Sequence, residues 1–436
     1  MSFDFVITNA IIVTADESDT VVRDGALAVS GGRIAAIGPA ADLSGNAGKV
    51  IDAAGMILMP GLINTHCHAA DSLFRGLIED LPLEPWLQTV WKAEGAILNR
   101  ETVRLGARLG FSELLLGGVT TVMDMFWHPT ETVGAARDVG LRVSTGGIFF
   151  DFPGMDKHGP ERRVRDAEAF FEEFGADPMV LPGTFPHGAY TVNPENLRAA
   201  RDATDRHGGL FCTHAAETKA ELADIESRYG RTVIRHLEHL GLLDERAVLA
   251  HCVWLDDEEI DILARRKVTV AHNPMSNLKL ASGFARIADM LAAGVRVTVG
   301  TDGAISGNDL DMWMALRMAA TMPKATTLRA DAVTTAQALR MVTQNGAEAL
   351  GAGERIGSLE VGKEADMILL ATDRAHAVPM FDPMTHIVYS AAKSDVRHVF
   401  VAGEQVVRDG ALVKSDLAET LAAVRTLEPA IAASIA

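Results

Sequence analysis

The middle of the chain alternates short apolar runs with longer segments of helical periodicity, and this alternation restricts the possible folds. The apolar runs are GLINTHCH (61–68), VTTVMD (119–124), LRVSTGGI (141–148), VLPGTFPH (180–187), GLFCTHAAE (209–217), AVLAHC (247–252), VTVAHN (268–273) and VRVTVGTD (295–302). The helical segments between them include 101–116, 161–175, 194–207, 218–240 and 256–266. Parallel strands need helical crossovers, so eight such units in order predict a closed (β/α)8 barrel, an α/β fold.

The two ends of the chain have a different pattern, because both are rich in short strand-like runs. The N-terminal runs include FVITNAIIV, and the C-terminal runs include ADMILLA, THIVYS and VRHVFVAGEQVV. Glycines at 31–32 and 403 lie between apolar stretches, as tight hairpins require. We therefore expect a small composite β-sandwich domain built from 1–58 and 357–415, around a barrel of 59–356. The Ala-rich segment 416–436 is expected to form a helix on the outside.

Composition excludes several classes of partner. The 436 residues carry a formal charge of −18, which argues against a nucleic acid or an anionic membrane surface as the partner. No run approaches the roughly 18 apolar residues of a membrane span, and the N-terminus has no basic signal region. Three cysteines suit a reducing compartment. These features predict a cytoplasmic protein with a small-molecule substrate, and they leave a homo-oligomer open.

Polar residues gather where the predicted barrel strands end. They are His66 and His68 (first strand), His187 (fourth), His214 (fifth), His251 (sixth), His272 (seventh) and Asp302 (eighth). The pair at 66 and 68 points to one side of its strand, because side chains alternate along a strand. The carboxyl ends of barrel strands meet at one face, which carries the active site in this fold. We therefore expect these side chains to converge there.

A nitrogen-rich cluster with one carboxylate is typical of a borderline divalent metal. Zinc is the first choice, and ferrous iron or cobalt suits the same donors. We expect His66, His68, His214 and Asp302 to be the ligands of a single catalytic ion, with one position left for water. Cys67, Cys212 and Cys252 flank candidate ligands, but we interpret them as small buried residues of the strands.

Other residues near the ligands suggest hydrolytic chemistry. A zinc ion lowers the pKa of a bound water to about 7. Glu217, three residues after His214, can carry a proton between that water and a substrate nitrogen. His251 is expected to stabilise an oxyanion or hold the water, and Asp302 to accept a proton. Trp86, in the long segment after the first strand, is expected over a flat substrate. His236 and His239 are expected on an exposed helix.

These motifs resemble the amidohydrolase superfamily, in its chlorohydrolase and nucleoside-deaminase branch. PGLINTHCH, HAAE, LAHC, HNPMSNLKLASG and GTDGAISGNDLDMW occur in the family's order over nearly the whole chain. The resemblance implies a barrel with a composite β-sandwich and one catalytic metal. It also implies the ligands and the catalytic partners named above, and hydrolytic deamination of a small heterocycle.

Within this branch the chain is most similar to S-adenosylhomocysteine/5′-methylthioadenosine deaminases. That resemblance implies that Glu94 holds ribose hydroxyls, that His187 binds the substrate, and that Glu217 contacts the purine. There is one departure from these enzymes. They have an arginine near the end of the third strand, and the matching position in this chain is Gly146 or Gly147. Arg162 or Arg163 is a candidate replacement for a second, later arginine.

Three functions stay open at this point. The favoured one is deamination of a purine nucleoside of the adenosine, methylthioadenosine or S-adenosylhomocysteine type. The second is deamination of guanine or another free base, or removal of chloride or an amine from a triazine. The third is a non-catalytic barrel that serves as a scaffold, which would require a degraded metal site.

Overall fold

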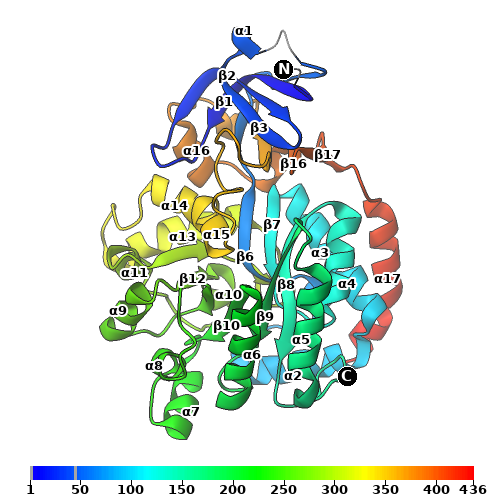
Figure 1. Ribbon diagram of the computed structural model, residues 1–436, viewed down its shortest axis with the longest axis vertical. Coiled ribbons are helices and arrows are strands. Elements are labelled where there is room, and N and C mark those ends of the chain that lie inside the picture. The colour runs from blue at the N-terminus through cyan, green and yellow to red at the C-terminus, as the bar shows by residue number, and fades with distance from the viewer. Residues whose placement is uncertain (1–2, 44–46) are drawn as a thin grey trace.

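The computed structural model describes residues 3–43 and 47–436, which form a barrel and a second sheet above it (Figure 1). The barrel strands are β6 (Leu62–His68), β7 (Val119–Asp124), β8 (Arg142–Phe149), β9 (Val180–Pro186), β10 (Leu210–Ala215), β11 (Ala247–His251), β12 (Thr269–His272), β13 (Arg296–Val299) and β14 (Asp302–Gly303). All paired neighbours in this sheet are parallel, and they follow chain order from β6 to β13. The predicted α/β barrel is confirmed.

The eighth strand position differs from the expectation, because the run 295–302 is interrupted. β13 ends at Val299, and after Gly300 and Thr301 the two-residue strand β14 pairs with β6. A Cβ atom at Gly300 would lie 2.3 Å from Oδ1 of Asn273 and 2.9 Å from Cβ of His66. Glycine therefore permits the close approach that brings the end of the barrel back to its first strand.

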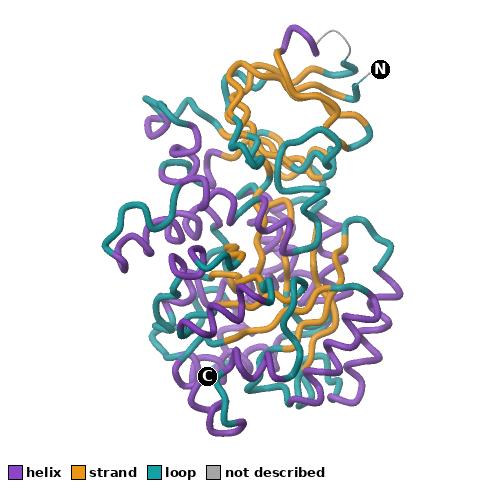
Figure 2. The backbone as a smooth tube through the Cα atoms, turned by 60° about the vertical axis from the view of Figure 1, so that its left-hand side comes forward, coloured by secondary structure: helices purple, strands orange, loops and turns teal. Residues whose placement is uncertain are grey.

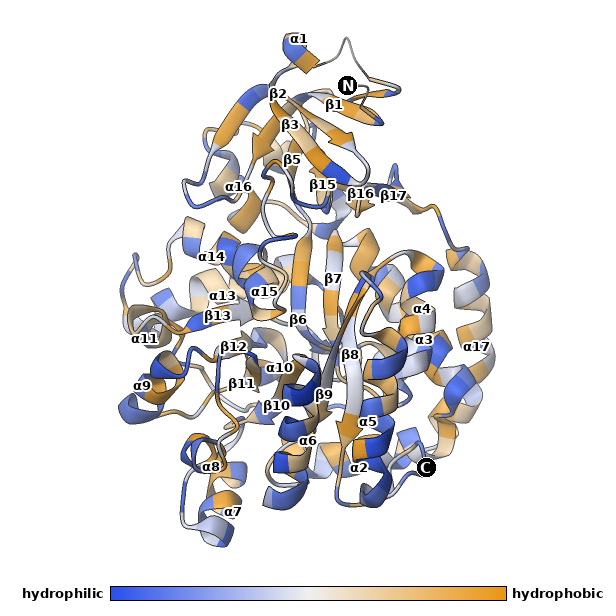
Figure 3. Ribbon diagram, viewed as in Figure 1, coloured by the Kyte–Doolittle hydropathy of each residue, from blue (hydrophilic) through white to orange (hydrophobic). Residues whose placement is uncertain are grey.

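Helices cover the outside of the barrel. The helices that follow its strands are α2 (Leu83–Ile97), α3 (Arg100–Leu116), α4 (Pro129–Val139), α5 (Pro160–Phe174), α6 (Pro194–His207), α7 (Lys219–Tyr229), α8 (Val233–His239), α9 (Asp257–Arg265), α10 (Pro274–Lys279), α11 (Ile287–Ala292), α12 (Ala304–Gly307), α13 (Met312–Thr327), α14 (Thr335–Met341) and α15 (Gln344–Ala349). A 3-10 helix, Ala69–Phe74, follows β6. The outward faces of α5, α6 and α9 are largely hydrophilic (Figure 3), as expected of amphipathic helices packed on a core.

Local signals set the ends of several helices. Asn193 caps α6, and its side chain accepts a hydrogen bond from the amide of Asn196 at 2.9 Å, with Pro194 at the first helical position. The segment 218–240 is not the single helix that the sequence predicts. Gly230 ends α7 in a left-handed conformation (φ 66°), and a new helix begins after Thr232. A glycine with positive φ is a common helix terminator.

The two ends of the chain build one sheet, as the sequence predicts. Its strands are β1 (Phe5–Val13), β2 (Val21–Ser30), β3 (Arg33–Pro39), β4 (Val50–Asp52), β5 (Ile57–Pro60), β15 (Met367–Leu370), β16 (Val396–Val401), β17 (Glu404–Arg408) and β18 (Ala411–Leu412), with the short helix α1 (Ala40–Leu43) after β3. The antiparallel pair β5–β15 joins the N-terminal and C-terminal parts. Figure 2 shows these strands gathered at the end of the molecule away from the C-terminus. The expected turns at Gly31–Gly32 and at Gly403 connect β2 to β3 and β16 to β17.

One expected strand is a helix. The run THIVYS forms most of α16 (Pro383–Tyr389). The side chain of Asp382 accepts hydrogen bonds from the amides of Met384 and Thr385, and Pro383 takes the first helical position. The β-branched residues in the run favour a strand, but the Asp-Pro cap starts a helix before they can pair.

The expected C-terminal helix is α17 (Leu417–Ala433), and its N-cap is Asp416. It lies along the outside of α3 and α2 (Figure 1). In the described part of the chain, no helix combines the length and the apolar content needed to cross a membrane.

A buried charge cluster connects the barrel to the terminal sheet. Arg142, at the start of β8, has a fully buried side chain, and its guanidinium donates to Glu364 Oε2 at 2.7 Å and Asp366 Oδ1 at 3.0 Å. The same group donates to the carbonyl of Pro178 at 2.8 Å. Residues 364 and 366 immediately precede β15, so this cluster fixes the register between the two sheets.

His236 is buried, although the sequence predicted an exposed helix face. Its ring stacks on Tyr229 with centroids 4.1 Å apart, and neither ring nitrogen has a hydrogen-bond partner among the described residues. The adjacent His239 is exposed as expected. The turn at Gly230 folds α8 back so that one of its faces covers Tyr229. Burial lowers the pKa of His236 to about 4.

Replacement of Arg142 by methionine should destabilise the protein. The change leaves Glu364 and Asp366 buried without their cation, a loss of about 3–5 kcal/mol for a broken buried pair. Chemical denaturation followed by circular dichroism measures the free energy of unfolding. The control is Arg137→Met, because Arg137 is largely exposed and pairs with Asp177 at the surface, where the expected loss is below about 1 kcal/mol. Equal losses in the two variants would contradict this account.

His236 should make the protein less stable at mildly acidic pH. The unfolded chain takes up a proton on this histidine near pH 6.5, its ordinary value, whereas the folded protein does so only near pH 4. The stability from neutral His236 is therefore present above about pH 6.5 and is lost as pH falls toward 4. His236→Phe should lose less stability than the wild type between pH 7 and pH 5 in denaturation experiments. His239→Gln should behave like the wild type, and an identical loss in all three proteins would refute the assignment.

Candidate active site

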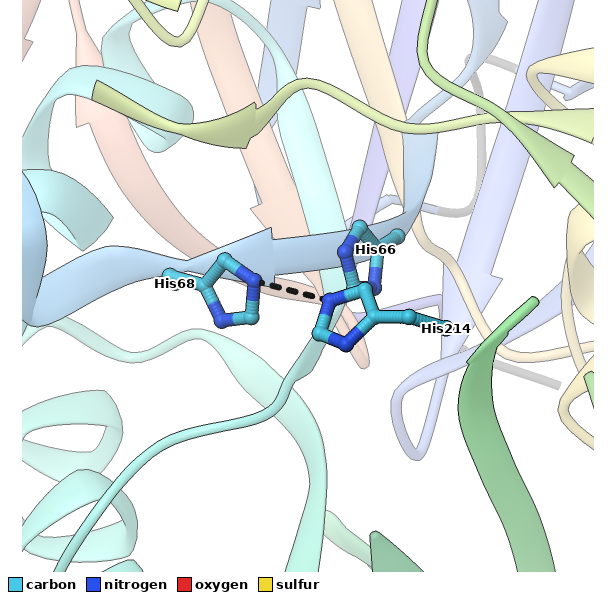
Figure 4. Close-up of side chains that lie close together, drawn as sticks. All are labelled: His66, His68 and His214. Atoms are coloured by element: carbon cyan, nitrogen blue, oxygen red, sulfur yellow. Dashed lines mark hydrogen bonds between the residues drawn. The ribbon is translucent and has the colours of Figure 1, made fainter. Parts of the chain in front are cut away.

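Four side chains converge at the carboxyl ends of the barrel strands. β6 supplies His66 and His68, β10 supplies His214, and β14 supplies Asp302. The Nε2 atom of His68 lies 3.3 Å from Nε2 of His214 and 3.2 Å from Oδ1 of Asp302. His66 Nε2 lies 3.5 Å from the same carboxylate oxygen. Figure 4 shows the three imidazoles facing a common centre.

The surroundings of the histidines orient their Nε2 atoms toward that centre. Nδ1 of His68 donates to the carbonyl of Met125 at 2.6 Å, and Nδ1 of His214 donates to the carbonyl of His187 at 2.6 Å. A proton on Nδ1 leaves Nε2 with a free lone pair, the form that binds a metal. Both ring nitrogens of His66 are buried without a hydrogen-bond partner. Three such nitrogens and one carboxylate fit a divalent cation.

The electrostatics of the cluster favour a positive charge beside Asp302. Burial lowers the pKa of His66 to about 4 and the pKa of His214 well below its usual value, so both rings are neutral at pH 7. Burial also opposes charge on His68, but the adjacent Asp302 outweighs it and raises the pKa of His68 to about 10. Burial alone would raise the pKa of Asp302, yet the two histidines hold it well below its usual value. The carboxylate is therefore ionised.

Two hydroxyl groups fix the second oxygen of Asp302. Ser276 and Ser306 donate to its Oδ2 at 2.6 and 2.8 Å, which leaves Oδ1 to face the histidines. The backbone of Asp302 has a φ of 61°, a conformation that favours glycine. His251, the last residue of β11, has a φ of 76°. Such strained residues cluster at functional sites, where the surrounding structure holds them in place.

Glu217 and His251 lie together beside the cluster. Oε2 of Glu217 is 3.7 Å from Nε2 of His251, and Ser282 donates to Oε1 of Glu217 at 3.3 Å. Nδ1 of His251 donates to Oδ1 of Asn277 at 2.8 Å. Burial raises the pKa of Glu217. One ring nitrogen of His251 lies within 4.8 Å of a ring nitrogen of His66 and of a carboxylate oxygen of Asp302. His251 therefore lies next to the expected metal position.

The sequence interpretation missed the residues that hold these groups. Glu221, one helical turn after Glu217, accepts a hydrogen bond from the Glu217 amide at 2.7 Å. Ser276 and Asn277 lie in the quoted motif HNPMSN, but the motif alone gives no sign of what each side chain contacts. Ser282 and Ser306 also lie in quoted motifs, HNPMSNLKLASG and GTDGAISGNDLDMW, which likewise indicate no role for them. The partners of Ser276, Asn277 and Ser282 become visible only when separate barrel units meet.

A cavity opens above the cluster, and its empty volume, including the open mouth, is about 680 Å³. Trp86 and Glu94 come to its wall from α2, the segment expected to roof the site, and His187 comes from the end of β9. All three predicted substrate-binding side chains therefore line one cavity with Glu217. The wall between them is mainly apolar and aromatic, and it includes Trp91, Met125, Phe126, Trp127, Ile148 and Phe150.

Two carboxyl groups lie side by side in this wall. Asp71, in the 3-10 helix after β6, and Glu94 are both buried and interact directly. Burial raises the pKa of Glu94 to about 7 and, together with the charge of Glu94, raises the pKa of Asp71 well above its usual value. The indole Nε1 of Trp127 donates to Glu94 Oε2 at 3.3 Å. The sequence interpretation did not single out Asp71.

Several expected contributors do not reach the cavity. A Cβ at Gly146 would lie 2.0 Å from the carbonyl of Gly183, and one at Gly147 would lie 2.4 Å from Cβ of Ala167. Neither position has room for a side chain. Arg162 and Arg163 are not among the residues that line the cavity, and the suggestion that either replaces an arginine there stays a prediction. Arg163 pairs with Asp156 behind the Trp127 ring.

The remaining candidates have structural surroundings. His272 is buried at the end of β12, and burial lowers its pKa to about 3, but it lies outside both groups of potential metal donors. Cys67, Cys212 and Cys252 are buried free thiols. Burial raises the pKa of all three thiols, as the interpretation of these residues as small core side chains requires.

Comparisons with known proteins agree with this geometry. A model of the "Amidohydrolase family" matches residues 57–406, and one of an "Imidazolonepropionase-like composite domain, bacteria" matches residues 25–44. A 5-methylthioadenosine/S-adenosylhomocysteine deaminase from Syntrophobacter fumaroxidans is 40% identical over 97% of both chains. A 5′-deoxyadenosine deaminase from Methanosarcina acetivorans is 38% identical over 97% of both chains.

A solved structure of an adenosine deaminase from Xanthomonas campestris with bound zinc superposes with a TM-score of 0.96. It is 34% identical in sequence, and the match covers 99% of each chain. The matched family model spans the barrel strands that carry all four convergent side chains. The chain therefore belongs to the amidohydrolase family.

Proposed function

We propose that the protein is a zinc-dependent aminohydrolase that converts an adenosine-type nucleoside and water into the 6-oxo product and ammonia. The single observation that supports this most strongly is the arrangement of Glu217. It is a buried carboxylate beside His251 that lines the same cavity as the convergent histidines and Asp302. The deaminase relatives act on nucleosides of this type by name. S-adenosylhomocysteine, methylthioadenosine, deoxyadenosine and adenosine form the candidate substrate class.

In this proposal His66, His68, His214 and Asp302 hold one ion. Zinc suits the three nitrogens and single carboxylate better than magnesium or calcium, which prefer oxygen ligands. A zinc-bearing relative makes it the preferred choice over ferrous iron, which suits the same donors. When bound, zinc supplies an activated water for attack and positive charge to stabilise the developing oxyanion.

Glu217 would move the proton that the reaction needs. Its carboxylate takes a proton from the attacking water and delivers it to the ring nitrogen next to the amino-bearing carbon. The C–O bond forms as the ring C=N bond opens, so charge stays balanced. Burial raises the pKa of Glu217, which makes its carboxylate a stronger base than an exposed glutamate. Glu217 lies 3.7 Å from His251 and belongs to neither group of potential metal donors, which supports a role in proton transfer and not as a ligand.

His251 and Asp302 would complete the reaction. His251, held through Nδ1 by Asn277, presents Nε2 to the same region as Glu217 and can stabilise charge on the added oxygen. Asp302 keeps Oδ1 free of the serine hydroxyls. It can accept the second proton of the added oxygen and pass it to the departing amine. The C–N bond then breaks, and ammonia leaves as the 6-oxo product forms.

The cavity wall would recognise the rest of the nucleoside. Trp86 offers a flat apolar face for the purine, and Glu94 offers a carboxylate for the ribose hydroxyls. His187 stacks on Phe150 with ring centroids 4.7 Å apart, and its Nδ1 lies 2.9 Å from the hydroxyl of Thr191. This contact orients Nε2 of His187 for a substrate hydrogen bond. Burial lowers the pKa of His187 to about 3, so the ring is neutral at pH 7.

Ammonia release from the zinc-loaded protein tests the proposal directly. The panel contains adenosine, 5′-deoxyadenosine, 5′-methylthioadenosine, S-adenosylhomocysteine, guanine and an aminotriazine. We expect turnover of at least one adenine nucleoside and none of guanine or the triazine. Turnover of guanine or the triazine alone, or chloride release from a chlorotriazine, would replace the proposed function. Metal content is measured on the same sample.

Glu217→Gln should retain zinc but lose turnover. Glutamine keeps the shape of the side chain but cannot carry a proton, and such a loss typically lowers kcat by a factor of about 10²–10⁴. Metal analysis by mass spectrometry and steady-state ammonia assays measure the two effects. Glu226→Gln is the matched control, because Glu226 is an exposed residue on α7. Near-full activity of Glu217→Gln would exclude the proton-transfer role.

Glu221 should act as a positioning residue for Glu217. In Glu221→Gln the side-chain amide oxygen can still accept the hydrogen bond from the Glu217 backbone amide. The variant removes a buried carboxyl group next to Glu217. Burial and the charge of Glu217 raise the pKa of Glu221 to about 7. The variant removes this titration, so the acidic limb of the kcat profile should move to lower pH. The measurement is kcat from pH 5 to pH 9 for this variant, the wild type and Glu226→Gln. A purely structural role would lower activity at all pH values and leave the limb in place.

A further inference from the structure

Asp71 has no function in the reaction described so far, yet it lines the reaction cavity. It lies three residues after His68, and its side chain is about as buried as that of Asp302. No group among the described residues donates a hydrogen bond to its Oδ1. Its Oδ2 faces Gly303, where an added Cβ would lie 3.2 Å away. A buried, unpartnered carboxylate oxygen at the wall of a cavity requires a donor, and the cavity is where a donor can come from.

Glu94 is the direct neighbour of Asp71, and the pair concentrates negative charge at one point of the wall. His68 is a basic neighbour that lowers the pKa of both groups, but it is already held by Asp302, and two adjacent buried carboxyl groups are unfavourable for folding. The indole of Trp127 is the single hydrogen-bond donor that the described residues offer to the pair's side chains in this wall. Other residues of the wall, such as Val90 and Met125, are apolar.

No lysine or arginine lines this cavity within the described chain. The adjoining outer cavity shares Leu83, Leu87 and Tyr190 with it and contains one basic residue, Arg228. Arg228 is already paired, because it donates to Asp224 at 2.8 Å and to the carbonyl of Tyr190 at 3.3 Å. Glu84 and Glu221 border the same outer cavity. A substrate that extends outward therefore passes acidic groups without meeting a free cation.

We propose that Asp71 is a specificity-determining residue that forms with Glu94 a two-carboxylate subsite for hydrogen-bond donors of the sugar and disfavours anionic 5′ substituents. This inference rests on the proposed function. Two acceptor groups match the two hydroxyls of a ribose, and each hydroxyl can donate to one carboxyl group. The 5′ carbon of that sugar then lies next to the acid pair, so a negative group attached there is repelled and left without a counter-ion.

The subsite therefore discriminates between nucleoside substrates by the charge of their 5′ substituent. A hydrogen atom or a methylthio group fits against the apolar wall of Trp91, Ile148 and Phe150. An ammonium group gains from the acidic surroundings. The carboxylate of S-adenosylhomocysteine loses hydration and gains no cation, which favours the shorter nucleosides as substrates.

Three adenine nucleosides test the inference: 5′-methylthioadenosine, its carboxyethylthio analogue and its aminopropylthio analogue. We expect kcat/KM for the anionic analogue to be about tenfold or more below that for the other two. Asp71→Asn removes one carboxyl group of the pair and keeps the size of the side chain, so it should narrow this difference to about threefold or less. Glu94→Gln should change the ratio in the same direction, which keeps the test valid if one variant folds poorly. Circular dichroism and zinc content check both variants.

Asp80→Asn is the matched control, because Asp80 is an exposed residue of the same segment and lies outside the cavity. It should leave the wild-type ratio unchanged. Equal kcat/KM for the anionic and neutral nucleosides, or an unchanged ratio in both Asp71→Asn and Glu94→Gln, would overturn the inference and leave the proposed function intact. No ammonia from the three nucleosides, while adenosine or 5′-deoxyadenosine is turned over, would overturn the inference alone. No ammonia from any adenine nucleoside, with zinc bound, would overturn the proposed function and the inference together.

Discussion

The ionised carboxylate of Asp302 is the group on which the site depends. A buried charge is costly unless it is hydrogen-bonded and paired, and here the pairing comes from four side chains that lie in three barrel units. Two serine hydroxyls take one oxygen, while two imidazoles approach the other. The closing of the barrel sets this arrangement, because β14 joins β6 directly beside His68. For that pairing to form, strand β13 must end at Val299 and the chain must pass through Gly300.

The barrel is a rigid framework, and several residues at the ends of its strands have a strained backbone conformation. His251 and Asp302 both have positive φ values, as does Ala216 in the turn before Glu217. These residues are held by hydrogen bonds such as those from Ser276 to Asp302 and from His251 to Asn277. Each support comes from a different βα loop than the residue it holds. A site assembled in this way is ordered before substrate arrives, which lowers the reorganisation that catalysis requires.

Much of this fold could be predicted from periodicity, because barrel strands read as short apolar runs with polar residues at their ends. The same reasoning located His66, His68, His214 and Asp302, whose convergence follows from parallel topology alone. It failed where a local signal outweighed the pattern. In α16 the Asp382–Pro383 cap overrode a β-branched run, and Gly230 divided one expected helix into two. His236 became buried because of that division, which no helical periodicity could reveal.

The residues that sequence reasoning missed share a different cause. Ser282, Asn277 and Asp71 matter through contacts with groups far away in the chain, and no spacing encodes those contacts. The two candidate arginines show a related limit, because the sequence does not reveal which partner a side chain reaches. The sequence offered Arg162 and Arg163 as replacements, but the structure directs Arg163 to Asp156 behind the Trp127 ring.

Asp71 and Glu94 together suggest a role that neither residue suggests alone. A fold selected for stability alone would place a cation or an apolar side chain opposite Glu94. This cavity places a second carboxyl group there, and the glycines of β8 leave no room for a balancing arginine on the facing strand. The metal cluster requires its own negative charge from Asp302, so further acids nearby add cost without helping the ligands. A cost of that kind is retained where a bound molecule offsets it, and hydroxyl donors of a sugar do so without adding charge. Under the proposed function, the polarity of the cavity therefore matches the sugar of the substrate.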